Sequence, residues 1–278
     1  MYADDLTRVA EQARAKAAYL ERVPAGYLIL SALAGAYLAF GITLIYCIGA
    51  PFAADGAAAQ KLVMACAFGV ALTLVVFAGS ELFTGNNMVC AIGALDGAMT
   101  WRMLGRVWGF SLIGNLAGSL GLAWLIAQSG VLSHAPQSDL VFKAVATKMS
   151  LSGWELFIRG ILCNWLVCLA VWMAGRTSSE TAKLLLIFWC LLAFIGSGFE
   201  HSIANQSLLA IALFLPHPDS ITWNGFLWNQ VWVILGNVVG GSVFVGGLYW
   251  MAGRLGVSRR HEAHAPMLSV VSTSGMRT

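Results

Sequence analysis

Charged residues are scarce in this chain. Only 10% of its 278 residues are Asp, Glu, Lys or Arg, whereas 59% are hydrophobic, and the mean hydropathy is +0.76. In soluble globular proteins about a quarter of the residues are charged. The composition therefore predicts an integral membrane protein. A net charge of only +3, with no basic stripe along the chain, argues against a nucleic-acid partner.

Several chemical signatures are also missing. The six cysteines include no CxxC pair, which argues against zinc ribbons and thioredoxin-like redox chemistry, and they are expected to be buried free thiols. The chain contains no HExxH zinc motif and no nucleotide-binding loop. We therefore expect no metal site, no cofactor and no enzymatic activity. Residues 1–22 are charged throughout, so they do not form a signal peptide.

The uncharged stretches predict six membrane spans, because about 20 apolar residues are needed to cross a bilayer. The spans are expected at 26–49, 62–95, 107–128, 153–174, 184–214 and 227–251. The second and fifth are expected to be broken, each into two half-helices. An amphipathic helix is expected over 4–22, where apolar residues recur at helical spacing.

The chain is accordingly divided into three parts. Residues 1–25 are expected to form a cytoplasmic N-terminal segment, 26–251 a six-span membrane domain, and 252–278 a disordered cytoplasmic tail. Six spans place both termini on one side. With both termini in the cytoplasm, all but four of the 16 Lys and Arg residues fall on the cytoplasmic side; the exceptions are Lys61, Lys143, Lys148 and Arg159. This bias predicts the termini-in orientation.

The two broken spans carry related polar interruptions. One is Gly79-Ser80-Glu81-Leu82-Phe83-Thr84-Gly85-Asn86-Asn87, and the other runs from Gly196 to Asn205 and contains Glu200 and His201. A carboxylate at the centre of a bilayer costs roughly 2.5–3.5 kcal/mol on insertion scales. Irregular backbone at that depth is tolerated only where it is buried or lines a cavity. We therefore expect loops at 80–86 and 197–204 to border a polar path through the membrane.

A second repeated sequence pattern links spans three and six. Both contain the pattern GNxxG, with Asn115 in the first and Asn237 in the second. The pattern therefore indicates two three-span halves, 26–128 and 153–251. Because three spans carry the chain to the opposite side of the membrane, the second half must cross the membrane in the opposite orientation to the first. Such inverted repeats with matching broken helices point to a central permeation site. The glycines are expected to allow close helix packing, and the two asparagines to hold the broken-helix loops.

These motifs resemble the formate/nitrite transporter family. The resemblance rests on GSELFTGNN at 79–87, GILCNWLVCLAVWM at 160–173 and GFEHSIAN at 198–205, and it extends through all six spans. Residues 78–85 and 163–165 are most similar to the nitrite branch. The resemblance implies an all-α, aquaporin-like protomer with broken spans two and five, a homopentamer in the bacterial inner membrane, and one pore in each protomer.

The resemblance also implies roles for particular residues. Seven polar residues are assigned to the pore: His201, Thr84, Asn164, Lys148, Glu200, Glu81 and Asn205. Among them, His201 is the pore histidine, Asn164 on span four is its hydrogen-bond partner, Thr84 is the loop threonine that faces it, and Lys148 is a vestibule lysine. The apolar constrictions are assigned to Phe68, Leu72, Leu82, Phe83 and Phe194. Arg159 departs from the family pattern, so its role stays open.

The residues indicate a mechanism for a small anion. His201 is the only histidine within a span, and an imidazole with an unperturbed pKa of about 6.5 can attract an anion or hand it a proton. A bare anion pays a large desolvation cost at apolar rings, whereas neutral nitrous or formic acid does not. Nitrite is the favoured substrate, with formate and hydrosulfide as alternatives. The sequence leaves proton-coupled transport and anion conduction both open, and Glu81 and Glu200 are expected to stabilise the loops.

Two other classes of function compete with an anion channel. A membrane-embedded enzyme could use His201 and Glu200 as an acid–base pair, but the chain offers no nucleophile with a matching base. A channel for neutral solutes, of the aquaporin type, would be expected to carry paired Asn-Pro-Ala motifs. The second break has Ile203-Ala204-Asn205 instead, which favours the anion channel.

Overall fold

The described part of the chain is all helical. The structure is a computed structural model that describes residues 2–263, with side chains as far as Leu255. The helices in chain order are α1 (Ala3–Arg22), α2 (Pro24–Ala54), α3 (Gln60–Ala67), α4 (Gly69–Phe77), α5 (Phe83–Leu95), α6 (Trp101–Ser129), α7 (Gln137–Ser150), α8 (Gly153–Ala174), α9 (Glu180–Ser197), α10 (Ser202–Phe214), α11 (Trp223–Val239), the π-helical segment η1 (Gly240–Gly247) and α12 (Leu248–Ala263).

Six helical stretches are long and apolar enough to cross a membrane. They are α2, α3 with α4, α6, α8, α9, and α11 continued through η1 into α12. The six predicted spans are therefore confirmed, and the helix of span four, Gly153–Ala174, has the predicted bounds. The helices of spans one, three and six extend beyond the predicted ends, because polar residues at the ends of a helix still add to its backbone hydrogen bonding.

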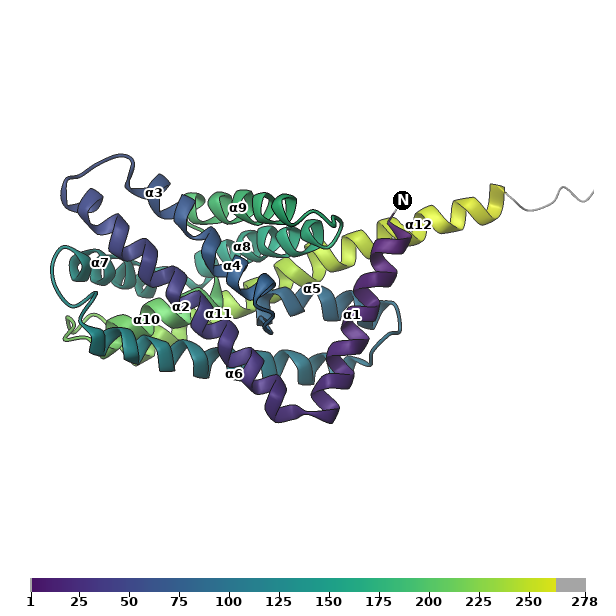
Figure 1. The fold of residues 1–278 in the computed structure, drawn as a ribbon, viewed down its shortest axis with the longest axis horizontal. Coiled ribbons are helices and arrows are strands. Elements are labelled where there is room, and N and C mark those ends of the chain that lie inside the picture. The colour runs from purple at the N-terminus through teal and green to yellow at the C-terminus, as the bar shows by residue number, and fades with distance from the viewer. Residues whose placement is uncertain (1, 264–278) are drawn as a thin grey trace, which may run out of the picture.

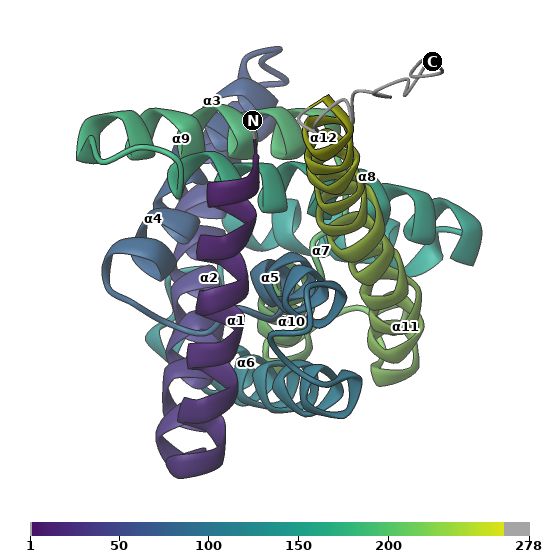
Figure 2. The same cartoon turned by 90° about the vertical axis from the view of Figure 1, so that its right-hand side faces the viewer.

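The two half-helices α5 and α10 lie at the centre of the bundle. Along the long axis of the molecule they occupy opposite halves, with α10 to the left and α5 to the right (Figure 1). Viewed along that axis, they lie in the middle of a ring formed by the longer helices (Figure 2). Their first turns meet, since a hydrogen bond joins Thr84 in α5 to His201 at the start of α10. Spans two and five are therefore broken as predicted.

The breaks are shorter than predicted. The non-helical stretches are 78–82 and 198–201, compared with the expected loops at 80–86 and 197–204. Each contains a glycine with a positive φ, Gly79 at 76° and Gly198 at 75°, a conformation that side chains with a Cβ rarely adopt. Thr84 consequently lies in the first turn of α5 rather than in a loop.

Each half of the chain is held by a tightly packed helix pair, α2 with α6 and α8 with α11. A methyl group added at Gly118 would overlap the backbone carbonyl oxygen of Ala32, and one at Gly236 would overlap that of Phe157. Both glycines belong to the repeated GNxxG pattern. These are the close approaches between backbones that small residues permit in membrane helices.

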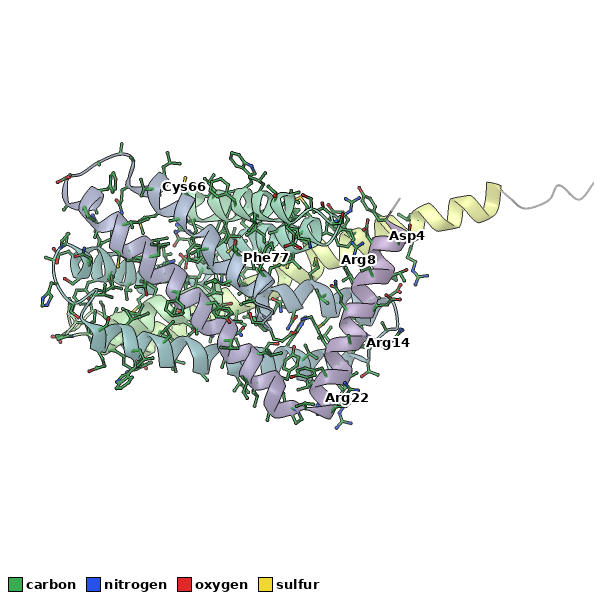
Figure 3. All side chains as sticks on the ribbon, viewed as in Figure 1. Asp4, Arg8, Arg14, Arg22, Cys66 and Phe77 are labelled. Atoms are coloured by element: carbon green, nitrogen blue, oxygen red, sulfur yellow. The ribbon has the colours of Figure 1, made fainter. Side chains whose placement is uncertain are left out.

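Two amphipathic helices lie outside the bundle at its opposite ends. The predicted N-terminal helix is α1, which buries Leu6, Val9, Ala13 and Leu20; Arg8, Arg14 and Arg22 lie along it (Figure 3). The second helix, α7, falls between the predicted spans three and four, where no helix was predicted. The sequence feature that indicates this helix is the apolar pair Val141 and Val145, four residues apart and both buried. So short an apolar pattern does not stand out among the uncharged stretches that indicate membrane spans.

The C-terminal segment differs from the prediction. The helix of span six continues through α12 to Ala263, although we expected a disordered tail from residue 252. Leu, Arg, Glu and Ala are good helix formers, so extending an existing helix through them costs little. Arg254 also pairs with Asp96 at 2.6 Å. The rest of the predicted tail, 264–278, lies outside the described residues.

Candidate functional site

The first turns of α5 and α10 meet at His201. Its Nε2 lies 3.1 Å from the hydroxyl oxygen of Thr84, and the histidine is only 3% exposed. Each helix begins at this point, so the positive ends of two helix dipoles converge here. Free backbone N–H groups and convergent dipoles at helix N-termini favour an anion.

The hydrogen bonds of His201 define the protonation of its ring. The residue is the N-cap of α10, and its Nδ1 accepts a hydrogen bond from the backbone N–H of Ala204 at 3.2 Å. In a neutral imidazole one nitrogen accepts and the other carries the hydrogen. The hydrogen is therefore on Nε2, which donates to Thr84. The ring also stacks against Phe194 at a centroid distance of 6.0 Å.

Glu81, in the first break, is surrounded by hydrogen-bond donors. Lys16 of α1 lies 2.6 Å from its carboxylate, Tyr27 donates to Oε2 at 2.8 Å, and Asn86 donates to the same oxygen at 3.0 Å. A carboxylate with three donors is well satisfied in an apolar surrounding. All three donors are side chains, and two of them, Lys16 and Tyr27, come from other helices.

Glu200, in the second break, has the same arrangement. Lys148 of α7 lies 2.7 Å from Oε2, and Asn205 donates to that oxygen at 2.6 Å. In both halves a left-handed glycine comes two residues before the carboxylate and an asparagine comes five residues after it. In both halves the lysine comes from an amphipathic helix that precedes the first span. The repeat therefore includes α1 and α7 as well as the three spans.

Asn115 and Asn237 hold the two breaks. The side-chain oxygen of Asn115 accepts from the N–H of Phe83, and its amide donates to the carbonyls of Ser31 and Glu81. Asn237 accepts from the N–H of Ser202 and donates to the carbonyls of Gly160 and Glu200. These bonds satisfy N–H groups that a helix start leaves without a partner. They also explain why α5 and α10 begin earlier than predicted.

Asn164 does not bind His201, so the predicted partnership is wrong. Its side-chain amide donates to the carbonyl oxygens of Thr84 at 3.1 Å and Asn237 at 2.7 Å, and to Oδ1 of Asn87 at 3.1 Å. Both ring nitrogens of His201 already have partners on other residues. Asn164 instead connects α8 to the first turn of α5 and to the GNxxG segment of α11.

A large cavity reaches from the end of the bundle at α7 to His201. It has a volume of about 490 Å³ and is bordered by residues of α2, α3, α7, α8, α9 and α10. Its charged and histidine lining comprises Lys61, Asp139, Lys143, Lys148, Arg159, Glu200 and His201. We call this cavity the vestibule. Lys148, Glu200 and Asn205, which the resemblance assigned to the pore, line it. Arg159, whose role the sequence left open, lines it too.

The other side of His201 is apolar. A small cavity of about 10 Å³ is lined by Leu38, Phe68, Leu72, Leu82, Val167, Leu191, Phe194 and His201. The rings of Phe68 and Phe194 meet edge to face at 5.7 Å. Four of the five residues predicted to form the constriction lie here. Phe83 does not, because it packs edge-on against Trp108. Leu38, Val167 and Leu191 were missed, since nothing in the sequence distinguishes them from other buried apolar residues of a span.

Within the described residues, no group of three or more His, Cys, Asp or Glu side chains could hold a metal ion. All six cysteines are free. Four are buried as expected, but Cys47 is half-buried and Cys66 is exposed on α3. Both lie on membrane-spanning helices, where an apolar thiol can face lipid.

The fold and the site define a class of protein. Two oppositely oriented repeats, two broken helices that meet at the centre, and a path from a charged vestibule to an apolar constriction are features of membrane channels and transporters. The family model described as "Formate/nitrite transporter" matches residues 3–251. The chain belongs to the formate/nitrite transporter family, as the resemblance predicted, and this is a family of transporters and channels rather than enzymes.

Individual relatives agree with this assignment. The chain is 42% identical to "Nitrite transporter NirC" of Salmonella typhimurium over 256 residues, which cover 91% of this chain and 92% of the relative. A solved structure entitled "FNT family ion channel" is similar with a TM-score of 0.85 and 42% identity, over 90% of this chain and 98% of that one. A "Pentameric formate channel with formate bound" has a TM-score of 0.69 and 28% identity, over 84% and 98%.

Proposed function

We propose that the protein conducts small monovalent anions, with nitrite as the favoured substrate, through a pore in each protomer. The observation that carries the proposal is the position of His201. It lines both the vestibule and the constriction, so an anion moving between them passes its ring. Nitrite is favoured because a relative 42% identical over most of both chains is named a nitrite transporter.

The hydrogen bonds of His201 support a coupled passage of anion and proton. Adding a proton to Nδ1 breaks the capping bond from Ala204 and places a cation at the positive end of the α10 dipole, which is unfavourable. An anion beside Nε2 offsets that cost. We infer that the proton and the anion occupy this point together.

The proton then moves from Nε2 to the anion. The anion becomes its neutral conjugate acid, and the imidazolium becomes a neutral imidazole whose hydrogen is on Nδ1. The ring returns to its resting form when Nε2 takes a proton from water and Nδ1 releases one, so that the capping bond from Ala204 forms again. The neutral acid avoids most of the desolvation cost that a bare anion would pay at Phe68, Leu72 and Phe194. Each cycle carries one anion and one proton in the same direction, so net transport is electroneutral.

The assembly and orientation are also proposals. Large apolar side chains are exposed on the membrane helices, among them Trp189 at 61% and Leu62 at 59%, and a membrane or a neighbouring protomer covers such faces. A similar solved channel is entitled pentameric, which supports a homopentamer. The bias of Lys and Arg supports insertion in a bacterial inner membrane with both termini cytoplasmic. The neighbouring positions of α1 and α12 support termini on one side.

Uptake into proteoliposomes tests the proposed function. Nitrite, formate and hydrosulfide should be compared at two external pH values, with glycerol and water permeation measured by swelling in the same vesicles. We expect nitrite to enter fastest and its uptake to rise as the pH falls. Fast glycerol or water entry with no anion uptake would instead identify a channel for neutral solutes.

A further inference from the structure

Four cationic side chains line the vestibule: Lys61 of α3, Lys143 and Lys148 of α7, and Arg159 of α8. Among the described residues, only two carboxylates line it with them, Asp139 and Glu200. The cations come from three helices, of which α7 and α8 are consecutive and α3 lies in the other half of the chain. The vestibule therefore carries an excess of positive charge that no local sequence pattern indicates.

The charge of Lys148 is already paired. Its Nζ lies 2.7 Å from Oε2 of Glu200, and the two side chains are only 20% and 3% exposed. Its backbone carbonyl accepts a hydrogen bond from Asn229, which also accepts from Asn205. At this distance the field of the ammonium is largely cancelled by the carboxylate. Lys148 is thus a positioning residue, which holds Glu200 and the second break.

The other three cations are less tightly paired than Lys148. Among the described side chains, no carboxylate lies within 4.0 Å of Lys61 or Lys143. Arg159 is 3.8 Å from Glu155, and both side chains are at least 38% exposed; such exposed pairs contribute little. The cavity connects all three cations to His201.

We infer that Lys61, Lys143 and Arg159 form an anion-recruiting site in the vestibule, separate from the paired Lys148. The inference rests on the proposed function. A cleft lined by charges of one sign, with low-dielectric walls, concentrates ions of opposite sign and raises their rate of entry. The site takes small monovalent anions without a fixed geometry, because its three charges belong to different helices, with Lys61 and Lys143 exposed and Arg159 half-buried.

The transport experiment compares the triple variant Lys61→Gln, Lys143→Gln, Arg159→Gln with the wild type. Nitrite uptake from the vestibule side is measured at low and at high ionic strength. We expect the apparent KM at low ionic strength to rise on the order of tenfold, with the maximal rate unchanged, and its dependence on salt to flatten. A matched control, Arg14→Gln, Arg22→Gln, Arg102→Gln, removes three exposed cations at the opposite end of the molecule and should leave the KM unchanged. An unchanged KM and salt dependence in the vestibule variant would overturn the inference.

A second readout does not depend on transport. Thr147 is exposed and lines the vestibule, so a cysteine placed there by Thr147→Cys, in a Cys66→Ser background, reports the local potential. Its rate of modification by a negatively charged methanethiosulfonate, divided by that of a positively charged one, should fall several-fold in the triple variant. The ratio should stay constant in Lys148→Met, Glu200→Gln, which removes a paired charge. An unchanged ratio in the triple variant contradicts the inference even if no tested anion is transported.

Discussion

His201 and Thr84 join the two halves of the protein across 3.1 Å, imidazole Nε2 to hydroxyl oxygen. Each residue stands in the first turn of a central half-helix, and the two half-helices belong to oppositely oriented repeats. The repeats are not chemically equivalent at this point. The residue that follows the loop carboxylate is His201 in the second half but Leu82 in the first. The imidazole of His201 in the second repeat thus occupies the position that the constriction residue Leu82 occupies in the first repeat.

The hydroxyl of Thr84 is expected to matter for transport and not for folding. It accepts from His201 Nε2–H and keeps its own hydrogen for an anion. Thr84→Val keeps the shape and removes the hydroxyl, so nitrite uptake should fall by about tenfold, the equivalent of a lost hydrogen bond of about 1–1.5 kcal/mol. The midpoint of thermal unfolding should change little, because His201 lines the vestibule and its Nε2–H can donate to water there. Thr84→Ser is the control and should keep uptake near the wild-type rate. Wild-type uptake by Thr84→Val would remove this residue from the pathway.

Asn115 and Asn237 are expected to be needed for folding. Each makes three hydrogen bonds that hold a break, and its removal leaves buried backbone groups without partners. Asn115→Ala and Asn237→Ala should each lower the free energy of unfolding by about 2–3 kcal/mol. Thermal unfolding of the purified protein in detergent measures this, with Asn224→Ala, at an exposed position, as the control. Equal midpoints for all four proteins would show that the breaks do not depend on these asparagines.

Alanine substitutions at two glycines of α6 should have very different effects on the stability of the protein. A Cβ at Gly118 would overlap the backbone of α2, whereas one at Gly121, three residues further along α6, meets nothing within 4 Å. Gly118→Ala should destabilise the protein by about 1–3 kcal/mol because the two helices must separate. Gly121→Ala should be neutral or slightly stabilising. The same thermal assay distinguishes them, and similar midpoints for both variants would contradict the packing described for α2 and α6.

The ion pair between Lys16 and Glu81 should stabilise the contact of α1 with the bundle. Lys16→Met leaves a carboxylate that is mostly buried without its cation, and should cost about 1–3 kcal/mol, less than a fully buried pair. The double variant Lys16→Met, Glu81→Gln should recover part of that loss. A double-mutant cycle on thermal stability measures the coupling between the two side chains. If the losses of stability in the two single variants add up to the loss in the double variant, the two side chains are not coupled and the ion pair does not stabilise the protein.

How far the sequence predicts this protein depends on the range of each interaction. Hydropathy and length identified the six spans, and repeated motifs identified the breaks, because both are local signals. The start of α5 at Phe83 could not be predicted, since it depends on a hydrogen bond to Asn115, 32 residues away. The helix α7 was missed because it is amphipathic and too short to span a membrane.

The same contrast between local signals and long-range contacts holds for the candidate site. His201 was singled out from its position in a span, and Lys148, Glu200 and Asn205, which the resemblance assigned to the pore, line the vestibule. The partner of His201 was predicted wrongly, because the direction of the Asn164 side chain is set by three acceptors on α5 and α11. The shared vestibule of Lys61, Lys143 and Arg159 depends on how three helices pack, and no spacing in the sequence indicates it.

The central claim is that anion and proton pass His201 together, and one measurement tests it most directly. Nitrite uptake into proteoliposomes is followed at external pH values from about 5.5 to 7.5, a range that brackets the ordinary pKa of histidine, with the membrane potential clamped at several values. For the wild type, we predict uptake that rises as the pH falls and does not respond to the potential. For His201→Phe, we predict a large loss of uptake and of its pH dependence. Uptake that follows the potential and is indifferent to pH, or wild-type uptake by His201→Phe, would contradict the account.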